Sequence, residues 1–487
     1  MNKFINDLEQ ATNFAYTENM GITHKSTLNK VYDLFAFGGA MRNRTKEDCI
    51  LLFKNAYEED PVYALKCLFY LRDIRGGQGE RRFFRECLKW FAEYDTSKAL
   101  SLIPLVAEYG RWDDLFCLID TPIETKMFNF LYQQFKIDLE SKTPSLLGKW
   151  LKSENTSSFE SRKIAKKTRQ AFGLTARTYR KYLSELRERI NIVERLMSAN
   201  EWGKIEFDKI PSKAGLIYKN AFARRDIIKE KYKAFAKDKN TKVNASTLYP
   251  YNVVEQALNY NQRFDDEAQT RRAMINKYWD NLNDYFNGKT LNGICVCDTS
   301  ASMYGTPMNV AISLSLYCAE KNTGPLKDYF ITFSSYPKLV KTEGIDFVDK
   351  AQRIKNKSIV DDTNIEKVFN LILDQAITNN WKQEDIPETI IVISDMEFNC
   401  CTEMRVSKAQ TEMEAIEETW NRNGFKMPRL IFWNVDARQE NIPMKDNGKV
   451  TFVSGFSPVI FEQVIGNKNG MDLMYDILNS ERYAKVQ

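Results

Sequence analysis

The sequence CDTSASM places Asp298, Ser300 and Ser302 at alternate positions directly after the apolar run LNGICV. Two further segments offer the same kind of side chain: DDTN contains Thr363 ahead of a helical pattern, and the apolar run in ETIIVISDM ends at Asp395. Carboxylate and hydroxyl oxygens are the ligands that hard cations prefer. These five residues therefore predict a site for Mg²⁺, or for another divalent cation such as Mn²⁺ or Ca²⁺.

Two other interpretations of CDTSASM remain open. Asp298 or either serine can cap the following helix, because Ser and Asp are favoured N-cap residues. A serine nucleophile needs a base, and the single histidine, His24, lies far away in the polar stretch GITHKST, where we expect it at the surface. No base and no second carboxylate-rich metal position accompany the motif, which favours a protein that is not an enzyme.

An alternating pattern of strands and helices is expected to bring these ligands together. From about residue 288, the apolar strands NGICVCD, DYFITFSS, PKLVKTEG, ETIIVISDM, RLIFWNVDA and KVTFVSG are separated mostly by amphipathic helices. This pattern predicts a doubly wound, Rossmann-like α/β domain over residues 288–487, with a parallel sheet covered on both faces. Cys295 and Cys297 share one face of their strand and are expected in the core. Ligands of such sheets bind beyond the carboxyl ends of the strands, where Asp298 and Asp395 stand.

Residues 1–287 predict an all-α domain. Helices of 10 to 16 residues with short joints, such as TKEDCILLFKNAYEED with Thr45 as N-cap, suggest an irregular HEAT-like solenoid. TSKALSLIPLVAEYG is expected to begin at a Thr96 cap and to end at Gly110. The apolar spacing from Tyr179 to Leu196 is helical throughout.

The charge is concentrated in one part of this helical domain. The whole chain carries +5, but residues 161–239 hold 22 basic and 9 acidic residues, a net of +13. Such a segment can contact several phosphates, so it predicts RNA binding. Arg72 and Arg75 beside GGQG are further candidates, since glycine permits close approach of the backbone. The predicted RNA-binding residues are Arg72, Arg75, Lys163, Lys166, Lys167, Arg169, Arg177, Arg180, Lys181, Lys213, Lys219, Arg224 and Arg225.

Aromatic residues are interleaved with these charges. Tyr179, Tyr182, Tyr218, Phe222 and Tyr232 suit base stacking if they are exposed. Their helical spacing fits equally well with burial in the core, and for each of them the core is the more common location.

Motifs from both halves resemble known families. DTSAS, Thr363 and Asp395 look like the metal-ion-dependent adhesion site of von Willebrand factor A domains. TENMGITHKSTLNKVYDLFAFGGAMRN, LRDIRGGQGERRFF and AEYGRWDDL resemble segments of TROVE modules of Ro-type ribonucleoproteins, and of an uncharacterised sister family with the same two-part layout. The resemblance implies a ring of helix pairs closed by the A domain, with RNA on a basic outer face and single-stranded ends in the hole.

The leading functional hypothesis is a non-enzymatic RNA-binding scaffold for structured or misfolded non-coding RNA, with a protein partner that donates a carboxylate to the metal. The alternative is a metal-dependent protein–protein adaptor, for example a partner of an AAA+ ATPase, without an RNA function. No apolar run is long enough to span a bilayer, and the N-terminus lacks a signal-peptide core. We therefore expect a cytoplasmic protein with no membrane contact.

Overall fold

The computed structural model describes residues 8–9, 11–261, 265–333, 336–357, 364–400, 410–465 and 469–487. Its first part is a helical region that follows a two-stranded hairpin, and its last part is a six-stranded sheet with its helices. The predicted two-part arrangement of a helical part and an α/β part is therefore confirmed, but the first part is not all-α because it contains the hairpin β1–β2.

The elements of the first part are β1 (Phe14–Tyr16), β2 (Ile22–His24), α2 (Lys30–Phe37), η1 (Gly38–Asn43), α3 (Lys46–Glu59), α4 (Pro61–Arg72), α5 (Arg82–Tyr94), α6 (Thr96–Tyr109), η2 (Trp112–Leu118), α7 (Glu124–Glu140), α8 (Leu147–Trp150), α9 (Phe159–Ala171), α10 (Ala176–Arg189), α11 (Val193–Ser198), η3 (Trp202–Lys204), η4 (Phe207–Lys209), α12 (Ser212–Arg224), α13 (Lys229–Lys237), α14 (Pro250–Leu258) and α15 (Asp266–Asp280).

The elements of the last part are β3 (Gly293–Asp298), η5 (Ala301–Met303), α16 (Thr306–Lys321), β4 (Tyr329–Phe333), β5 (Leu339–Lys341), α17 (Phe347–Lys357), α18 (Ile365–Thr378), η6 (Gln383–Asp385), β6 (Thr389–Ser394), α19 (Glu412–Arg422), β7 (Arg429–Asn434), β8 (Val450–Ser454), α20 (Val459–Val464), α21 (Gly470–Leu478) and η7 (Glu481–Tyr483).

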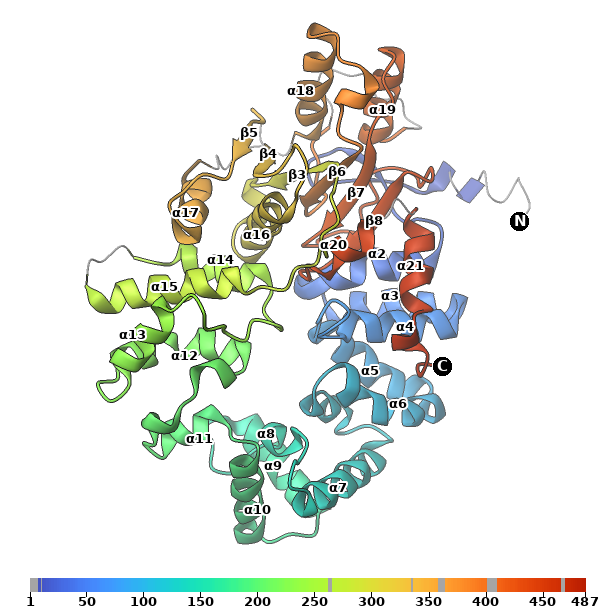
Figure 1. Cartoon of the computed structure of the whole chain (residues 1–487). Coiled ribbons are helices and arrows are strands. Elements are labelled where there is room, and N and C mark those ends of the chain that lie inside the picture. The colour runs from blue at the N-terminus through green and yellow to red at the C-terminus, as the bar shows by residue number, and fades with distance from the viewer. Residues whose placement is uncertain are drawn as a thin grey trace.

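The helices follow a closed course that begins and ends at the sheet (Figure 1). Helices α2–α6 lead away from the sheet, α7–α10 lie farthest from it, and α11–α15 return. Successive helices pack on one another along this course, for example α3 on α4 and α5, and α5 on α6. At the return, α14 packs against α16 and α17 of the α/β part. The helical region thus leads away from the sheet and returns to it.

Local signals in the sequence explain most helix boundaries. Thr45 accepts a hydrogen bond from the Asp48 amide and caps α3, as predicted. The cap of α6 is Asp95 rather than Thr96, because the Asp95 carboxylate accepts from the Lys98 amide. The single helix expected across residues 179–196 is wrong: α10 ends and α11 begins around Asn191, whose φ of 54° cannot continue a right-handed helix.

The sheet has the order β5-β4-β3-β6-β7-β8. All neighbours are parallel except β5, which pairs antiparallel with β4, so the predicted parallel sheet is correct for the other five strands. Read along the chain, this is the 3-2-1-4-5-6 order of doubly wound sheets, in which the direction of winding reverses between the first and fourth strands. Here those strands are β3 and β6, so their carboxyl ends mark the crevice where ligands bind in such folds.

Both faces of the sheet are covered, which explains its continuous apolar strands. Cys295 and Cys297 are buried and point toward α16, where Cys318 and Ser315 are their neighbours. On α20, Phe461 packs against Trp433 of β7 with ring centroids 5.0 Å apart. The predicted core position of the two cysteines is confirmed.

Helix α2 joins the helical region to the free edge of the sheet at β8. The Phe452 amide donates to the Tyr32 hydroxyl over 2.9 Å, and the Ser454 hydroxyl donates to the Phe35 carbonyl over 3.1 Å. A Cβ at Gly39 would lie 2.6 Å from the Ser454 carbonyl oxygen, so only glycine permits this approach. The edge strand is therefore shielded by a helix from the opposite end of the chain.

The hairpin β1–β2 also packs on the α/β part. The His24 amide donates to the Ile442 carbonyl over 3.0 Å, and the imidazole Nε2 lies 3.1 Å from a Glu414 carboxylate oxygen. His24 is 1% exposed, so the expected surface position is wrong. Its burial depends on contacts with residues almost 400 positions away, which no local pattern encodes.

Candidate functional site

Asp298 and Asp395 stand at the carboxyl ends of β3 and β6, the two strands that flank the crevice. Both side chains are fully buried. One carboxylate oxygen of Asp298 accepts from the Ser300 amide at 2.9 Å, and the other accepts from the Ser394 hydroxyl at 2.5 Å. The structure therefore brings together two of the predicted cation ligands at the edge where the sequence placed them.

The serine hydroxyls of the motif complete this cluster. The Oγ atoms of Ser300 and Ser302 are 3.0 Å apart. Neither serine acts as a side-chain cap: Ser300 precedes η5 without a capping hydrogen bond, and the N-cap of α16 is Gly305. The capping interpretation therefore does not describe this turn. Thr363, the fifth predicted ligand, lies outside the described residues.

Ionisation of the buried carboxyl groups of Asp298 and Glu397 is unfavourable. Burial, together with the neighbouring Asp395, raises the pKa of Asp298 to about 7. Burial also raises the pKa of Glu397 to about 7, and Asp395 adds to that rise. A positive charge placed near Asp298 and Glu397 would stabilise their ionised forms.

Arg438 supplies part of that charge. Its guanidinium donates to Asp395 over 2.9 Å and pairs with Glu18 over 2.8 Å. Glu397 accepts from the Glu18 amide at 2.7 Å and from the Asn441 side chain at 2.8 Å. Sequence reasoning missed Arg438 and Glu397. Both follow the carboxyl ends of strands, in VDAR and SDMEF, so the rule that found Asp395 could have found them.

The residues at this edge fit a cation in charge and in donor type. Asp298 and Asp395 would hold it, with the hydroxyls of Ser300 and Ser302. Within the described part of the chain, no three His, Cys, Asp or Glu side chains are grouped so as to hold a metal ion. A cation at this edge would therefore depend on the hydroxyl ligands, which leaves its positive charge only partly neutralised.

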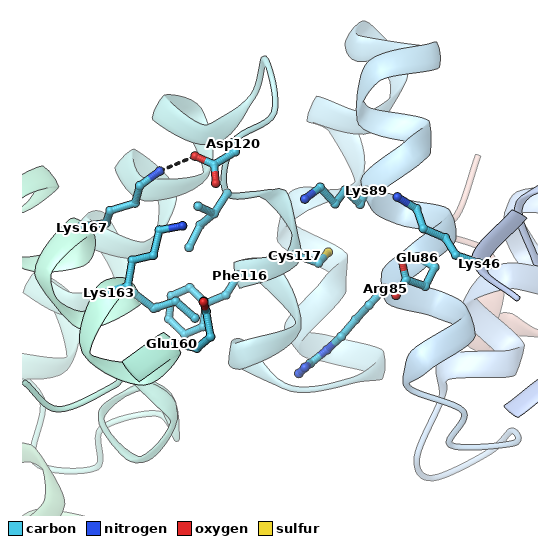
Figure 2. Close-up of a pocket in the computed structure, with 12 residues that line it drawn as sticks. Lys46, Arg85, Glu86, Lys89, Phe116, Cys117, Asp120, Glu160, Lys163 and Lys167 are labelled. Atoms are coloured by element: carbon cyan, nitrogen blue, oxygen red, sulfur yellow. Dashed lines mark hydrogen bonds and ion pairs between the residues drawn. The ribbon is translucent and has the colours of Figure 1, made fainter. Parts of the chain in front are cut away.

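Two of the predicted RNA-binding residues of α9, Lys163 and Lys167, line a hollow of about 350 Å³. Figure 2 shows Lys163 of α9 and Lys89 of α5 pointing into this hollow from opposite sides. Lys163 and Lys166 are exposed, whereas Lys167 is paired with Asp120 at 2.6 Å. A further ion pair holds Arg169 against Glu154 at 2.7 Å.

The residues predicted on α10 and α12 are mostly exposed. Arg177, Arg180 and Lys181 project from α10, and Lys213 projects from α12. Arg224 at the end of α12 is engaged with Glu267 at 2.8 Å, and Arg225, directly after α12, with Asn200 at 2.6 Å. Arg75, in the loop after α4, is exposed and donates to the Glu108 carbonyl.

Two predicted RNA contacts do not fit their positions. Arg72 is 1% exposed and pairs with Asp114 at 2.7 Å, so its charge serves the core of the helical region. Lys219 is buried among neutral acceptors, with hydrogen bonds to the Leu216 carbonyl and the Gln256 side chain. Burial lowers the pKa of Lys219 to about 8. Neither side chain can reach a phosphate at the surface.

The interleaved aromatics belong mainly to the core. Tyr179, Phe222 and Tyr232 are buried, and Tyr182 and Tyr218 are partly buried. The rings of Phe222 and Tyr232 pack at 5.5 Å from each other. Tyr179, Phe222 and Tyr232 are therefore not available for base stacking.

Two family models match the chain and meet near the start of β3. A domain of unknown function, DUF2828, matches residues 17–143 and 145–288, and another, DUF7788, matches residues 292–482. The chain belongs to the DUF2828 family. It is also similar to "Uncharacterized protein L728" of Acanthamoeba polyphaga mimivirus, with 29% identity over 511 residues that cover 96% of this chain and 87% of the viral protein.

These matches correct the resemblance drawn from short motifs. The assignment to a TROVE or Ro-like family with a von Willebrand factor A domain is wrong, since the matching families are DUF2828 and DUF7788. The segment LRDIRGGQGERRFF illustrates the cause. Its Arg72 and Asp73 are buried and form ion pairs that any helical fold could select.

None of the helices among the described residues combines the length and the apolar character needed to cross a bilayer.

Proposed function

We propose that this protein binds RNA through residues 161–239, which we call the basic segment. The observation that supports the proposal is that many basic side chains of this segment are exposed and are not paired with carboxylates in the described part of the chain. Six of the predicted RNA contacts are among its Lys and Arg side chains that are exposed and have no carboxylate partner among the described residues: Lys163, Lys166, Arg177, Arg180, Lys181 and Lys213. Cations left free in this way are available to phosphates.

Contacts of this kind recognise the backbone and not the bases. Each phosphate neutralised by Lys or Arg releases a counterion, so affinity falls linearly with the logarithm of salt, with a slope of about −0.7 per contact for single strands. Six contacts would give a slope of about −4. Because the aromatic side chains of the basic segment are buried or partly buried, stacking adds little, and the protein would bind RNA of many sequences.

A matched pair of variants tests this proposal. One variant replaces the six named Lys and Arg side chains of the basic segment (Lys163, Lys166, Arg177, Arg180, Lys181 and Lys213) with Gln. The control makes six equivalent changes at exposed lysines of the α/β part: Lys338, Lys341, Lys382, Lys426, Lys445 and Lys449. Fluorescence anisotropy with a labelled single-stranded RNA, repeated over a salt series, measures affinity and slope.

Only the first variant should lose affinity and flatten the salt dependence. Equal losses in both variants would show that net charge, and not the basic segment, drives binding. Absence of binding by the unaltered protein near physiological salt would refute the proposed function.

The edge of the sheet favours a second candidate, a cation-dependent contact with an acidic protein partner. Asp298, Asp395 and the two serine hydroxyls support it, and Tyr304, 84% exposed, lies directly after η5. A divalent cation held there would supply an open coordination position for a carboxylate. Asp298→Ala and EDTA should each abolish such an interaction, while the sixfold variant of the basic segment should leave it unchanged.

A further inference from the structure

A pocket of about 530 Å³ lies between the loop after α8 and the helices α10 and α11. Its size falls within the range of small-molecule sites. Its lining carries four cationic side chains against one carboxylate: Lys149, Arg180, Arg187, Arg195 and Glu194. We call it the Arg187 pocket.

Arg187 is held in this pocket without a counter-charge. Its guanidinium donates to the Gly148 and Leu151 carbonyls, at 3.1 and 2.8 Å, and to the Ser153 hydroxyl at 2.8 Å. All three acceptors are neutral, and no carboxylate among the described residues pairs with it. Burial lowers the pKa of Arg187 because no acid offsets the charge. A guanidinium has five N–H groups, so two stay available for an anion.

The neighbouring cations reinforce this site to different degrees. Arg195 is engaged by Glu188 at 2.5 Å and by Glu201 at 3.7 Å. By contrast, Arg180 donates only to the Ala176 carbonyl, and Lys149 has no carboxylate partner among the described residues. The pocket therefore keeps unneutralised positive charge beside Arg187, which suits a phosphate group.

Glu194 adds a feature that a simple anion site would not need. One of its carboxylate oxygens accepts from the Tyr218 hydroxyl at 3.3 Å. The other oxygen, Oε2, is buried and has no hydrogen-bond partner among the described residues. A buried acceptor without a donor is costly, and a hydroxyl group on a ligand would satisfy it.

We propose that the Arg187 pocket binds a ribose phosphate unit of RNA, with the phosphate at Arg187 and a ribose hydroxyl donating to Glu194. The inference rests on the proposed RNA binding and adds selectivity to it. The free cations of the basic segment contact any nucleic-acid backbone alike, whereas the 2′-hydroxyl is the group that distinguishes RNA from DNA. The Arg187 pocket would therefore be the place where the protein recognises RNA as RNA.

Affinities for a short single-stranded RNA and for its 2′-deoxy counterpart, with deoxyuridine in place of uridine, test the proposal. The unaltered protein should prefer RNA by on the order of tenfold, the value of one hydrogen bond to a charged group. In Glu194→Ala the affinity for RNA should fall to that for the deoxy strand, while the deoxy strand binds at least as well as before. Glu194→Gln keeps a carbonyl acceptor and should retain most of the preference.

The control is Glu206→Ala, which removes the same charge from an exposed side chain outside the pocket. It should leave the preference unchanged. A preference for RNA that survives in Glu194→Ala, or no preference in the unaltered protein, would overturn the pocket assignment while leaving RNA binding intact. If neither strand binds at all, the proposed function falls together with the pocket.

Two further measurements separate the phosphate from the hydroxyl. Arg187→Lys keeps the positive charge but loses the forked donors, so both strands should weaken on the order of tenfold while the ratio between them persists. With the unaltered protein, uridine monophosphate should displace labelled RNA at lower concentration than deoxyuridine monophosphate. Equal displacement by the two nucleotides would contradict the assignment without reliance on any variant.

Discussion

Replacement of Asp298 by Asn should stabilise the cation-free protein at high pH. The carboxyl group is fully buried, and burial with the neighbouring Asp395 raises its pKa from 3.8 to about 7. A difference of this size corresponds to roughly 4 kcal/mol between the two protonation states. Asn has the same shape, and its carbonyl oxygen can still accept from the Ser300 amide. The main effect of the substitution is therefore to remove the unfavourable free energy of burying the ionised Asp298 carboxylate.

The sign of the pH dependence follows from the direction of the shift. Because the pKa of Asp298 is higher in the folded state than in the unfolded state, the folded protein binds more protons between about pH 4 and pH 7. Its contribution to stability is therefore lost as the pH rises through this window. At pH 8, Asp298→Asn should raise the free energy of unfolding by up to roughly 4 kcal/mol, whereas near pH 4 the gain should vanish.

Thermal unfolding in EDTA at pH 4, 6 and 8 measures this effect. For a domain of the size of the α/β part, 1 kcal/mol corresponds to about 2–4 °C in Tm, so a rise on the order of 10 °C is expected at pH 8. Asp374→Asn, at an exposed position of α18, is the matched control and should change little. A lower Tm for Asp298→Asn at pH 8 would refute the reasoning, because it would mean that the ionised carboxylate stabilises the cation-free fold.

Addition of Mg²⁺ extends the same experiment to the cation site. A ligand that binds only the folded state adds about 2.7 kcal/mol at a concentration of 100 Kd. The unaltered protein should gain stability with Mg²⁺ at pH 8, and Asp298→Asn should not. If Mg²⁺ leaves the Tm of the unaltered protein unchanged, the cation site is refuted while the argument about the buried acid stands.

Three other substitutions test the packing of the helical region and its junction with the sheet. Arg72→Met should cost about 1.5–3 kcal/mol in urea unfolding, since it removes the hydrogen bonds from Arg72 to the buried Asp114 carboxylate, which keeps Arg85 as a partner, while the folded protein keeps its RNA affinity. An unchanged free energy of unfolding would contradict the buried pair. Stability should rise between pH 8 and pH 10 because the pKa of Lys219 is lowered to about 8, and Lys219→Met should remove this rise; an unchanged rise would exclude Lys219 as its source. Gly39→Ala should cost about 1–3 kcal/mol and expose the edge of β8 to proteolysis, because the new Cβ meets the Ser454 carbonyl; unchanged stability would show that the contact relaxes freely.

The sequence predicted the α/β part well because β3, β6, β7 and β8 are buried on both faces. Runs such as ETIIVISDM are long, apolar and bounded by polar turns, so their type and limits are encoded locally. The same holds for Asp298 and Asp395, whose position at strand ends follows from the pattern alone. Thr45 and Gly110 marked helix ends for the same reason.

The parts that sequence reasoning missed depend on contacts between distant segments. His24 is buried only because β2 packs beside Ile442 and Glu414. Arg187 resembles any other arginine of a charged helix, and its unusual state arises from the carbonyls of the loop after α8. Composition alone also overstated the basic segment, since a charged side chain such as Lys219 can lie inside a helical fold when neutral acceptors surround it.

Ion pairs and a hydrogen bond join the sheet edge to the turn between β1 and β2. Arg438 contacts both Asp395 at the sheet edge and Glu18 in the turn between β1 and β2, and the Glu18 amide donates to Glu397. The first segment of the helical part therefore takes part in the electrostatics of the sheet edge. A cation at Asp395 would compete with Arg438 for that carboxylate, and the released guanidinium would still have Glu18 as a partner. Cation binding at the edge would thus change the ion pairing between the β1–β2 turn and the α/β part, so it should be measured in the full chain and not in an isolated α/β part.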